Sequence, residues 1–410
     1  MQVVHERCCG LDVHQKSVTA CVLLSAPDGT VTKKVRTFPT MTADLLALGD
    51  WLRSLEVTQV AMESTGIYWR PVFNVLEEGR TVILVNAQHI KAVPGRKTDV
   101  KDSEWLADLL RHGLLKASFI PPEPIRELRE LTRYRTTLIH ARTAEINRLH
   151  KVLESANIKL GAVASQVMGA SGRAMLDALL AGEQDPEVLA ELAKGRLRQK
   201  LPALRKALTG RVKPQHRVLL ERMLAHIDFL EESIQQVHQE IERCLIPFAP
   251  EMELLQTIPG VGEVAAGAIL AEIGTDMSRF PSAKHLAAWA GVCPGNRQSG
   301  GKRLKSKTRD GNTWLRGILG EVAWAISRRN DNYLSAQYHR LARRRGKLKA
   351  AVAVAHSVLV IAYHVLKEQQ PYQDLGKDYF DKLDATQLQR HHVHRLEALG
   401  FEVTLTPKAA

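Results

Sequence analysis

Four carboxylates in the first quarter of the chain have the residue type and the spacing to bind divalent cations. Asp12 lies in the apolar segment CCGLDVHQKSVTACVLL, and Glu63 ends the apolar run of VTQVAMESTG. Asp99 and Asp102 lie three residues apart in GRKTDVKDSEWLADLL, so a helix there would place both on one face. Hard cations need clustered oxygen ligands from separate elements of a rigid scaffold. Each acid alone also fits a turn or a helix cap, but the four together predict a site for Mg²⁺, or Mn²⁺ in its place, that acts on phosphodiester bonds.

A second reactive group lies in AGVCPGNRQSGGKRLKSKTRDGNTWLRGILGEVAWA, where Ser299 precedes two glycines. From Arg297 to Arg316 this segment holds seven Lys or Arg and one acid. Cationic groups would stabilise the charge that develops when a serine attacks a phosphodiester, and glycines would let backbone and phosphate approach closely. Without further context, a serine in a solvated basic loop is the simpler interpretation. The basic residues expected to contact nucleic acid are Arg297, Lys302, Arg303, Lys305, Lys307, Arg309 and Arg316.

The positive charge of the chain is concentrated in one segment. The 410 residues carry a net charge of +13, yet residues 1–120 hold 14 Lys or Arg against 13 acids. Residues 281–350 hold 16 against 3, an excess equal to that of the whole chain. A basic block this concentrated favours a polyanionic partner, through phosphate contacts and counterion release. A solvated cationic face is the alternative.

The length and the composition indicate a cytoplasmic protein of two or three domains. Hydrophobic residues make up 45% of the chain, enough to form cores, and no run of about 18 uninterrupted apolar residues predicts a membrane span. The N-terminus MQVVHERCCG lacks the basic-then-apolar order of a signal peptide. Five cysteines without metal-ligand spacing or a disulfide framework complete the expectation of a reduced, cytoplasmic protein.

Residues 1–120 have the element order of an α/β domain. The patterns predict strands at 8–13, 17–24, 30–38, 57–62 and 81–85, and helices at 42–54, 66–79 and 99–112. Three antiparallel strands followed by alternating helices and strands fit the topology of RNase H and RuvC-like nucleases. Actin-like sugar kinases also begin with an aspartate on a first hairpin, but they need glycine-rich phosphate loops, which residues 1–120 lack.

Two long helices are expected after the boundary at Pro121-Pro122-Glu123-Pro124. The first covers 125–155 and the second about 215–246. The second helix carries apolar residues at alternating spacings of three and four, a heptad seam formed by Leu220, Met223, Ile227, Leu230, Ile234, Val237, Ile241 and Cys244. This seam could pair with the first helix or with another copy of the chain, and the sequence favours neither. Residues 161–213 are expected to form small helices and loops between the two.

A further region begins near residue 252 with LLQTIPGVGEVAAGAILAEIG. Its core, Ile258-Pro259-Gly260-Val261-Gly262, matches the turn of a helix-hairpin-helix. Gly260 and Gly262 would allow a tight turn whose backbone amides face a DNA phosphate. Such hairpins also serve for packing alone.

The order GLDVHQK, ESTG, KTDVKD, IPGVG, then AGVCPG, QSGGK and GNTWLR resembles one family over roughly residues 8–365. It is the DEDD-type insertion-sequence transposases of the "IS one-ten" group, which are bridge-RNA-guided serine recombinases. The resemblance implies an α/β plus α fold, with a RuvC-like catalytic domain over 1–120, a coiled-coil and linker region over 121–250, and a C-terminal transposase domain over 251–370. Residues 371–410 form an extension to which we assign no role.

The matching motifs imply that Ser299 is the nucleophile. They also imply that four acids bind Mg²⁺, namely Asp12, Glu63, Asp99 and Asp102. Many relatives have two consecutive serines where this chain has a glutamine and then Ser299, so Ser299 is the only hydroxyl candidate at that position. The implied reaction is DNA strand exchange through a serine–5′-phosphate intermediate. The two blocks, about 200 residues apart, would meet in one composite site, within a subunit or across a homo-oligomer such as a dimer or tetramer. The resemblance also implies donor and target DNA and a structured guide RNA.

Two other functions fit parts of this pattern. A RuvC-like, structure-specific endonuclease would use water as the nucleophile, which would leave Ser299 dispensable. A non-catalytic DNA-binding protein, built on the helix-hairpin-helix and the basic block, would need neither the acids nor the serine. The four acids favour an enzyme, and the serine segment favours the recombinase.

Overall fold

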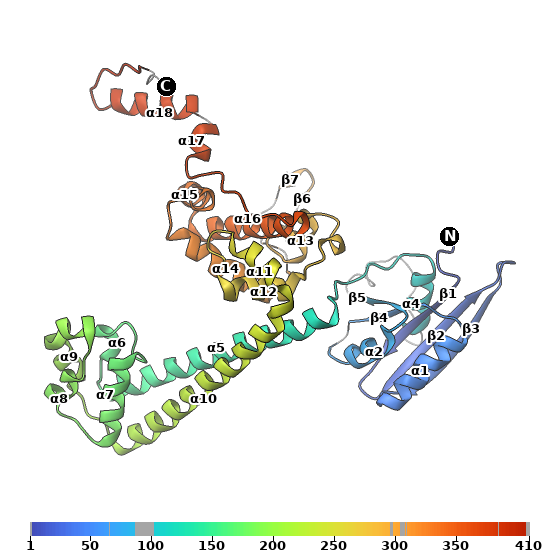
Figure 1. The fold of residues 1–410 in the computed structure, drawn as a ribbon, viewed down its shortest axis with the longest axis horizontal. Coiled ribbons are helices and arrows are strands. Elements are labelled where there is room, and N and C mark those ends of the chain that lie inside the picture. Colours follow the sequence, from blue (N-terminus) through green and yellow to red (C-terminus); the bar gives the residue numbers. More distant parts are fainter. Residues whose placement is uncertain are drawn as a thin grey trace. The chain divides into compact units, whose positions relative to one another are not determined.

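The computed structural model describes residues 2–64, 66–86, 102–295, 298–303, 308, 310–383 and 385–406. The chain divides into two compact units, residues 1–120 and residues 121–410 (Figure 1). The first unit combines a mixed sheet with helices, and the second is mainly helical. The expected class, an α/β region followed by an α region, is confirmed.

The first unit is built on a five-stranded sheet in the order β3-β2-β1-β4-β5. Its strands are β1 (Arg7–Val13), β2 (Ser17–Ser25), β3 (Val31–Pro39), β4 (Gln59–Glu63) and β5 (Thr81–Val85). β2 pairs antiparallel with both β1 and β3, whereas β4 lies parallel to both β1 and β5. The predicted turn after β1 is confirmed, because the amide of His14 donates to the carbonyl of Ser17 at 2.9 Å. The strand that carries Asp12 therefore lies at the centre of the sheet.

Helices cover both faces of this sheet (Figure 1). They are α1 (Thr42–Ser54) and α2 (Trp69–Leu76) on one face and α4 (Asp102–Arg111) on the other. Because side chains alternate along a strand, Cys9 and Leu11 of β1 join the core beneath α1 and α2, whereas Cys8 joins the core beneath α4. Residues 99–101 of the helix predicted at 99–112 lie outside the described residues.

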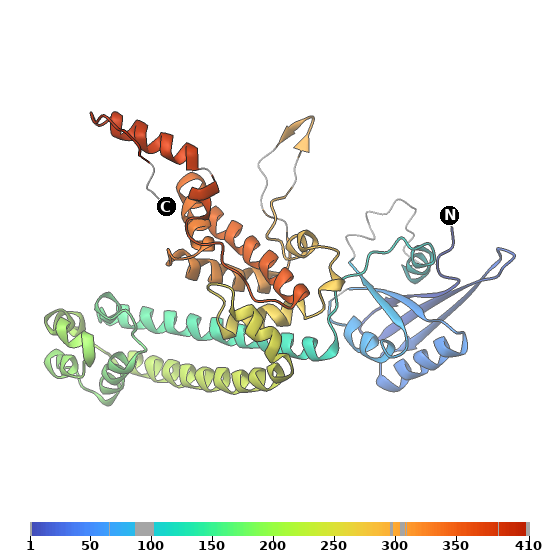
Figure 2. The same cartoon turned by 45° about the horizontal axis from the view of Figure 1, so that its top comes forward.

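Two long helices form an antiparallel hairpin in the second unit (Figure 2). They are α5 (Glu123–Ser155) and α10 (Pro214–Leu245). The predicted seam of α10 lies inward, with four positions half-buried and four buried, namely Leu220, Ile227, Leu230 and Ile241. In the structure this seam packs against α5 of the same chain, which is one of the two pairings that the sequence leaves open.

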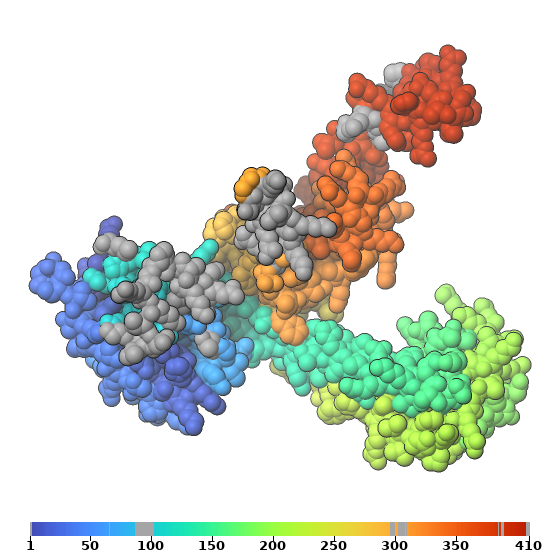
Figure 3. All heavy atoms as spheres, turned by 180° about the vertical axis from the view of Figure 1, so that it is seen from behind, coloured from blue at the N-terminus to red at the C-terminus, as the bar shows by residue number. Residues whose placement is uncertain are grey.

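Short helices occupy the segment between α5 and α10, as predicted. They are α6 (Leu160–Val163), α7 (Ala170–Ala181), α8 (Pro186–Glu191), the 3₁₀ helix η1 (Gly195–Lys200) and α9 (Leu201–Leu208). The structure adds that they share one apolar core with the adjoining ends of α5 and α10, to which Leu149, Leu176, Leu204 and Leu224 belong. The space-filling view shows this part as one continuous body (Figure 3).

The remaining helices of the second unit form a body with α16 (Lys347–Glu368). They are η2 (Ile246–Phe248), α11 (Ala249–Gln256), α12 (Glu263–Ile273), η3 (Met277–Arg279), α13 (Ala283–Trp289), α14 (Thr313–Ser327) and α15 (Tyr333–Arg345). Of these, α11, η3, α13, α14 and α15 contact α16, and α12 packs against α5, α11 and α14. By length and composition, α16 would be able to cross a membrane, although polar residues such as His356 interrupt its apolar run. Half of that stretch is buried against neighbouring helices, as expected of the core helix of a globular unit.

The segment after residue 370 is attached to this helical body. Its helices are α17 (Tyr379–Leu383) and α18 (Ala385–Glu397). The amide of Tyr372 donates to Oγ1 of Thr257 at 2.9 Å, and the ring of Phe380 stacks on Tyr333 of α15 with centroids 5.3 Å apart. The described side chains of α18 are mostly exposed.

Candidate active-site residues

Asp12 and Glu63 lie next to each other at the carboxyl ends of two neighbouring parallel strands. The register of β1 and β4 pairs Leu11 with Met62, and the two acids are the next residues on each strand. Because side chains alternate, both acids lie on the face opposite to Leu11 and Met62, which is the face that α4 covers. The side chain of Asp12 is 33% exposed and Glu63 is half-buried, so both remain accessible from solvent. Sites of open α/β sheets are found at this end of the strands.

Gly10 brings α4 against β1 and thereby sets the position of Asp102. A Cβ at Gly10 would lie 2.1 Å from the carbonyl oxygen of Ser103 and 2.4 Å from the amide nitrogen of Ala107. Only glycine allows so close an approach of two backbones. Asp102 is the first residue of α4, and Gly10 lies on the same face of β1 as Asp12. Backbone contact therefore holds the start of α4 over the strand that carries Asp12.

Two polar contacts surround these acids. Nε2 of His14 lies 3.1 Å from Oδ2 of Asp12, so the imidazole can orient one oxygen of that carboxylate. Lys33 of β3 donates to Glu104 of α4 at 2.8 Å, and this hydrogen bond raises the pKa of Lys33. The second contact adds a tie between α4 and the sheet, close to the half-buried Asp102.

The described acids have the oxygen ligands of a hard-cation site, but they do not form a complete set of metal ligands. Asp99, the fourth predicted acid, lies outside the described residues. Among the residues that the structure describes, no group of three or more His, Cys, Asp or Glu is placed to hold a metal ion. Asp12, Glu63 and Asp102 offer only carboxylate oxygens, which are the ligands that Mg²⁺ and Mn²⁺ prefer. The structure therefore brings three of the four acids to one face of the sheet and leaves the fourth undescribed.

The cysteines of the first unit do not compete with the carboxylates as reactive groups. Cys8, Cys9 and Cys21 are all buried. Burial raises the pKa of Cys8 to about 12 and holds the pKa of Cys9 well above its ordinary value. Thiols of such high pKa stay protonated at neutral pH, and the thiolate is the nucleophilic form. The acids are therefore the candidate reactive groups of this unit.

Ser299 lies at the tip of a short β-hairpin between α13 and α14 (Figure 2). The hairpin consists of β6 (Gln298–Ser299) and β7 (Lys302–Arg303). Ser299 pairs with Lys302, and the two residues that join the strands, Gly300 and Gly301, have φ of 54° and 74°. Positive φ at both central residues is what a two-residue type I′ turn requires. Gly300 and Gly301 therefore form the turn that follows Ser299. This is a role in addition to the close approach of backbone and phosphate that the sequence predicts for these glycines.

The two ends of this hairpin segment meet at a pair of glycines. A Cβ on Gly311 would lie 2.4 Å from the amide nitrogen of Gly291, so the two backbones are in contact there. Further along, Pro294 and Thr308 form an isolated antiparallel bridge. We call this constriction the neck of the serine hairpin, formed by Gly291, Val292, Gly311 and Asn312. The motifs AGVCPG and GNTWLR therefore supply the two sides of one neck.

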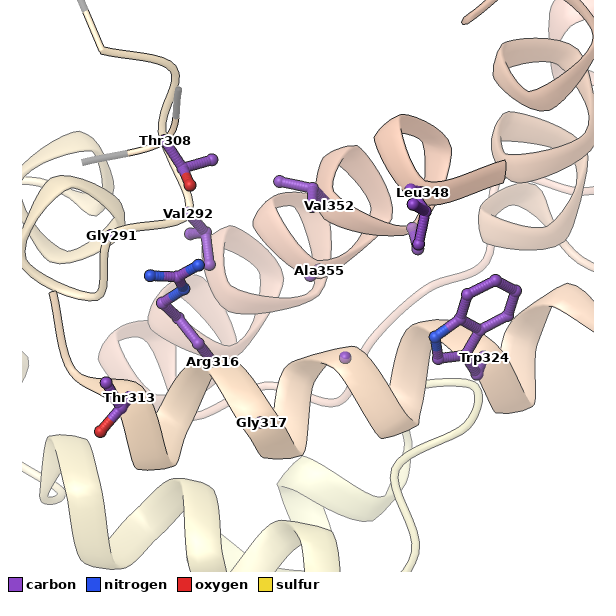
Figure 4. A pocket seen from close by; sticks show the side chains of 12 residues that line it. Gly291, Val292, Thr308, Thr313, Arg316, Gly317, Trp324, Leu348, Val352 and Ala355 are labelled. Atoms are coloured by element: carbon purple, nitrogen blue, oxygen red, sulfur yellow. The ribbon is translucent and has the colours of Figure 1, made fainter. Parts of the chain in front are cut away.

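The structure describes only some of the basic residues predicted to contact nucleic acid. Four of them lie outside the described residues: Arg297, Lys305, Lys307 and Arg309. For Lys302 and Arg303 the backbone in β7 is described. Arg316 extends from α14 beside the neck (Figure 4) and lines a groove of about 480 Å³ between α14 and α16. The side chains of Trp324 and Leu348, which are 40% and 75% exposed, lie at the other end of this groove.

The two glycines of the predicted helix-hairpin-helix have different surroundings. Both lie in the turn between α11 and α12, and Gly260 has a φ of 82°. A Cβ at Gly260 would lie 2.7 Å from Cγ1 of Ile326 on α14, whereas no described atom lies within 4 Å of a Cβ at Gly262. Gly260 is therefore needed for packing, and the exposed Gly262 at the start of α12 leaves room for a ligand.

Three residues that shape these sites escape the sequence analysis: Gly10, Glu272 and Asn312. A single acid in the apolar segment AAGAILAEIG is a signal for Glu272, because buried acids need partners. An asparagine before TWLRGIL is a signal for a helix cap at Asn312. No local signal marks Gly10, because its close contact joins segments about 90 residues apart.

Comparison with known proteins matches both parts of the chain to transposases. A family model of DEDD transposases, described as Transposase, matches residues 9–158, and a model described as Transposase IS116/IS110/IS902 family matches residues 252–339. A probable family 20 transposase of Pseudomonas aeruginosa is 28% identical over 331 residues, which cover 79% of this chain and 88% of that protein. The pilin gene-inverting protein of Moraxella bovis is 34% identical over 150 residues, 34% of this chain and 45% of that protein.

These matches make the protein a DNA transposase, an enzyme that recombines DNA. Within that class, the chain belongs to the IS110 family, whose models together span more than half of its length. A further relative, an uncharacterized protein of the insertion element IS116 of Streptomyces clavuligerus, is 28% identical over 62% of this chain and 70% of that protein.

Proposed function

We propose that this IS110-family transposase cleaves and exchanges DNA strands through a covalent serine–5′-phosphate intermediate. Ser299 is the nucleophile. Mg²⁺, or Mn²⁺, is held by four acids, Asp12, Glu63, Asp99 and Asp102. The observation that carries the proposal is the position of Asp12 and Glu63 at the carboxyl ends of the neighbouring strands β1 and β4, on the face of the sheet covered by α4, the helix that begins at Asp102. The strand order β3-β2-β1-β4-β5 supports a RuvC-like catalytic domain over residues 1–120.

The acids would act as ligands fixed before the DNA arrives. The three described acids come from β1, β4 and α4, and the contact of Gly10 with α4 fixes the distance between β1 and α4. Ligands that are positioned by rigid elements need no rearrangement during the reaction. When bound, Mg²⁺ supplies Lewis-acid chemistry, which polarises the scissile phosphate and stabilises charge on the leaving 3′ oxygen.

The step at Ser299 exchanges one phosphoester bond for another. Its Oγ forms a bond to phosphorus while the bond from phosphorus to the 3′ oxygen breaks, and the serine proton passes to solvent as the 3′ oxygen takes one up. The 3′ hydroxyl of a partner strand then attacks the same phosphorus, and Ser299 leaves as a hydroxyl. Serine is a weak nucleophile at its ordinary pKa, so it has to meet the acid site in order to react. We propose that they meet within one subunit or across a homo-oligomer, a dimer or a tetramer.

Nucleic-acid binding is assigned to the second unit. The excess of Lys and Arg in residues 281–350 supports contacts with DNA and with a structured guide RNA. The open position at Gly262 supports a phosphate contact at the start of α12. In this proposal, residues 121–250 are a linking arm, residues 251–370 the serine-bearing transposase domain, and the protein works in the cytoplasm. The name of the Moraxella relative, a gene-inverting protein, supports recombination between DNA sites.

Covalent trapping tests the proposal. The substrate is 3′-end-labelled DNA that spans the junction of the element with its flank, incubated with Mg²⁺ and the RNA transcribed from the element. Wild type is expected to form a labelled protein–DNA adduct, and both Ser299→Ala and Asp12→Ala are expected to abolish it. Ser306→Ala, a change at another serine of the same basic segment, is the matched control and should leave adduct formation intact.

The outcomes separate this function from its rivals. Metal-dependent strand cutting that gives no adduct and survives Ser299→Ala would make the protein a RuvC-like endonuclease that uses water. DNA binding with neither cutting nor adduct, for wild type and both variants alike, would make it a non-catalytic DNA-binding protein. An adduct that needs both Ser299 and Asp12 supports the composite site.

A further inference from the structure

Glu272 is a buried acid in an apolar helix, and its partners are all cationic or amide groups. Its side chain on α12 is 1% exposed. Nε and Nη2 of Arg133 donate to its two carboxylate oxygens at 2.7 and 2.8 Å, and Nε of Arg129 lies 3.6 Å from Oε2. Both arginines belong to α5. A bidentate arginine pair offsets the large cost of burying a carboxylate and fixes the orientation of this side chain.

Arg129 adds a second link between the same two helices. Its Nε and Nη2 donate to the carbonyl oxygens of Ala271 and Glu272 at 2.9 and 2.7 Å. These carbonyls belong to the last turn of α12, where helix carbonyls lack partners within the helix and attract cations. The end of α12 is therefore fixed to α5 through both backbone and side chain.

Asn312 connects this charged cluster to the serine hairpin. Its Nδ2 donates to Oε2 of Glu272 at 2.5 Å. Its Oδ1 accepts from the amides of Trp314 and Leu315, each at 3.1 Å, and so caps the N-terminus of α14. One side chain thus joins Glu272 to the point at which the hairpin segment returns to the helical body. Asn312 is also the direct neighbour of Gly311, whose backbone contacts Gly291 on the other side of the neck.

We propose that Glu272 is a positioning residue for the reaction at Ser299. By holding Asn312, it fixes the neck through which both ends of the hairpin segment leave the helical body. Through Arg129 and Arg133 it anchors that neck to α5, the helix that begins directly after the first unit ends at residue 120. The inference rests on the proposed role of Ser299 as the nucleophile. Displacements of about 1 Å far from the reacting atoms can slow a reaction about a hundredfold, so a loosened neck is expected to slow the serine step.

A second asparagine cap in the same unit provides a matched control. Asn332 caps α15 by accepting from the amide of Ser335 at 2.9 Å, and its Nδ2 donates to Asp331 at 2.8 Å. Both Asn312 and Asn332 therefore cap a helix with the side-chain oxygen and donate from the amide to a carboxylate. A change to aspartate preserves either cap and removes either donor, yet only one of the two positions lies in the neck.

The experiment compares Asn312→Asp, Asn332→Asp, Glu272→Gln and the double variant Glu272→Gln with Asn312→Asp. Single-turnover adduct formation is measured at saturating DNA with Mg²⁺ and the element's RNA, together with the DNA affinity and the hydrogen exchange of residues 286–295. Asn312→Asp and Glu272→Gln are expected to slow adduct formation at least about tenfold and to speed exchange at residues 286–295, with the DNA affinity unchanged. Asn332→Asp is expected to stay within about twofold of wild type in adduct rate.

The double variant tests the hydrogen bond itself. It exchanges the amide and the carboxylate between positions 272 and 312, so the amide at 272 can donate to the carboxylate at 312 while the cap on α14 remains. Its loss of rate is therefore expected to be smaller than the product of the two single losses, a coupling that general damage to the fold does not produce. If Glu272→Gln does not fold, the comparison of the adduct rates of Asn312→Asp and Asn332→Asp still tests the inference.

Two results would overturn the inference and leave the proposed function intact. One is a wild-type adduct rate in Asn312→Asp, and the other is an equal loss in Asn312→Asp and Asn332→Asp. A different result would contradict the proposed function: wild-type protein that cuts DNA but forms no adduct at Ser299. Slow adduct formation in the neck variants, normal formation in Asn332→Asp and recovery in the double variant together support Glu272 as the positioning residue.

Discussion

Gly10 on β1 and Ser103 on α4 are in backbone contact, so close that a Cβ at Gly10 would lie 2.1 Å from the carbonyl oxygen of Ser103. The contact lies two residues before Asp12 on the strand and one residue after Asp102 on the helix. Two candidate ligands on separate elements are thus fixed by a single backbone-to-backbone approach. Glycine in the motif GLDV is therefore a requirement of the site's geometry, in addition to being part of a strand.

Replacing Gly10 should damage the site through the position of α4. Gly10→Ala forces the helix away from β1, with an expected destabilisation of about 1–3 kcal/mol and a loss of DNA cleavage of at least about tenfold. Gly49→Ala on α1 is the control, because the nearest atom to a Cβ there, Cδ2 of Leu76, lies at 3.8 Å. It should stabilise the helix by about 0.5–1 kcal/mol and leave cleavage unchanged. Urea unfolding and a cleavage assay measure both; normal stability and cleavage in Gly10→Ala would contradict this role for the contact.

Much of the fold follows from local patterns in the sequence. Continuous apolar runs predict β1 and β2 within one residue at each end, because helices cover both faces of these strands and both sets of side chains are buried. The heptad seam predicts α10 almost to the residue, since a long helix has to keep one stripe apolar. Its partner is a different matter. Nothing in the seam distinguishes α5 of the same chain from a second copy, and the pairing with α5 is visible only in the fold.

The candidate site is predictable in part, for a related reason. Asp12 and Glu63 can be paired from the sequence, because acids at the carboxyl ends of two parallel strands lie at one edge of the sheet. Asp102 cannot be placed that way, since its position depends on the contact at Gly10. The link from Glu272 to Asn312 is also invisible to a local pattern, because it joins two helices 40 residues apart in the sequence. The RuvC-like assignment and the DNA contact of the helix-hairpin-helix remain predictions.

Metal binding should depend on Asp102 and should not depend on its neighbour Glu104. Asp102→Asn removes a charged oxygen ligand, so the affinity for Mn²⁺, followed by the electron paramagnetic resonance of the free ion, is expected to fall about tenfold or more. Glu104→Gln removes the same charge from the same helix, but Glu104 pairs with Lys33 at 2.8 Å. Its Mn²⁺ affinity should match wild type. Equal losses in both variants would indicate a general effect of charge and would contradict a ligand role for Asp102.

The buried cysteines should resist alkylation in the folded protein. Burial raises the pKa of Cys8 to about 12 and holds that of Cys9 well above its ordinary value, so at pH 8 both are protonated and shielded. Iodoacetamide at pH 8 is expected to modify them only after unfolding, as mass spectrometry of peptides with and without urea would measure. Cys244 on α10 is half-buried and serves as the internal comparison. Rapid native labelling of Cys8 would contradict the burial that underlies this expectation.

The ion pair between Arg173 of α7 and Asp228 of α10 should make the arm of the second unit sensitive to acid. Two hydrogen bonds, at 2.5 and 2.8 Å, lower the pKa of Asp228 and raise that of Arg173. Because the folded pKa of Asp228 is depressed, its contribution to stability is complete above the unfolded pKa of about 3.9 and is lost as the pH falls through the lower folded value. The carboxylate is half exposed, so the contribution at pH 7 is expected to be only about 0.5 kcal/mol.

Asp228→Asn should therefore lower the urea midpoint at pH 7 and at pH 5 and approach wild type as the pH falls through the folded pKa of Asp228, where the wild-type side chain also becomes neutral. Glu240→Gln is the control, because Glu240 pairs with Arg243 on the same helix, an exposed pair that holds no second element. Its midpoint should stay close to wild type at every pH. A difference between Asp228→Asn and wild type that stays constant as the pH falls would show that the loss comes from altered packing, because protonation of Asp228 removes the ionised pair. Convergence in acid, with no effect in Glu240→Gln, assigns the loss to the charge on Asp228 and so to the tie between α7 and α10.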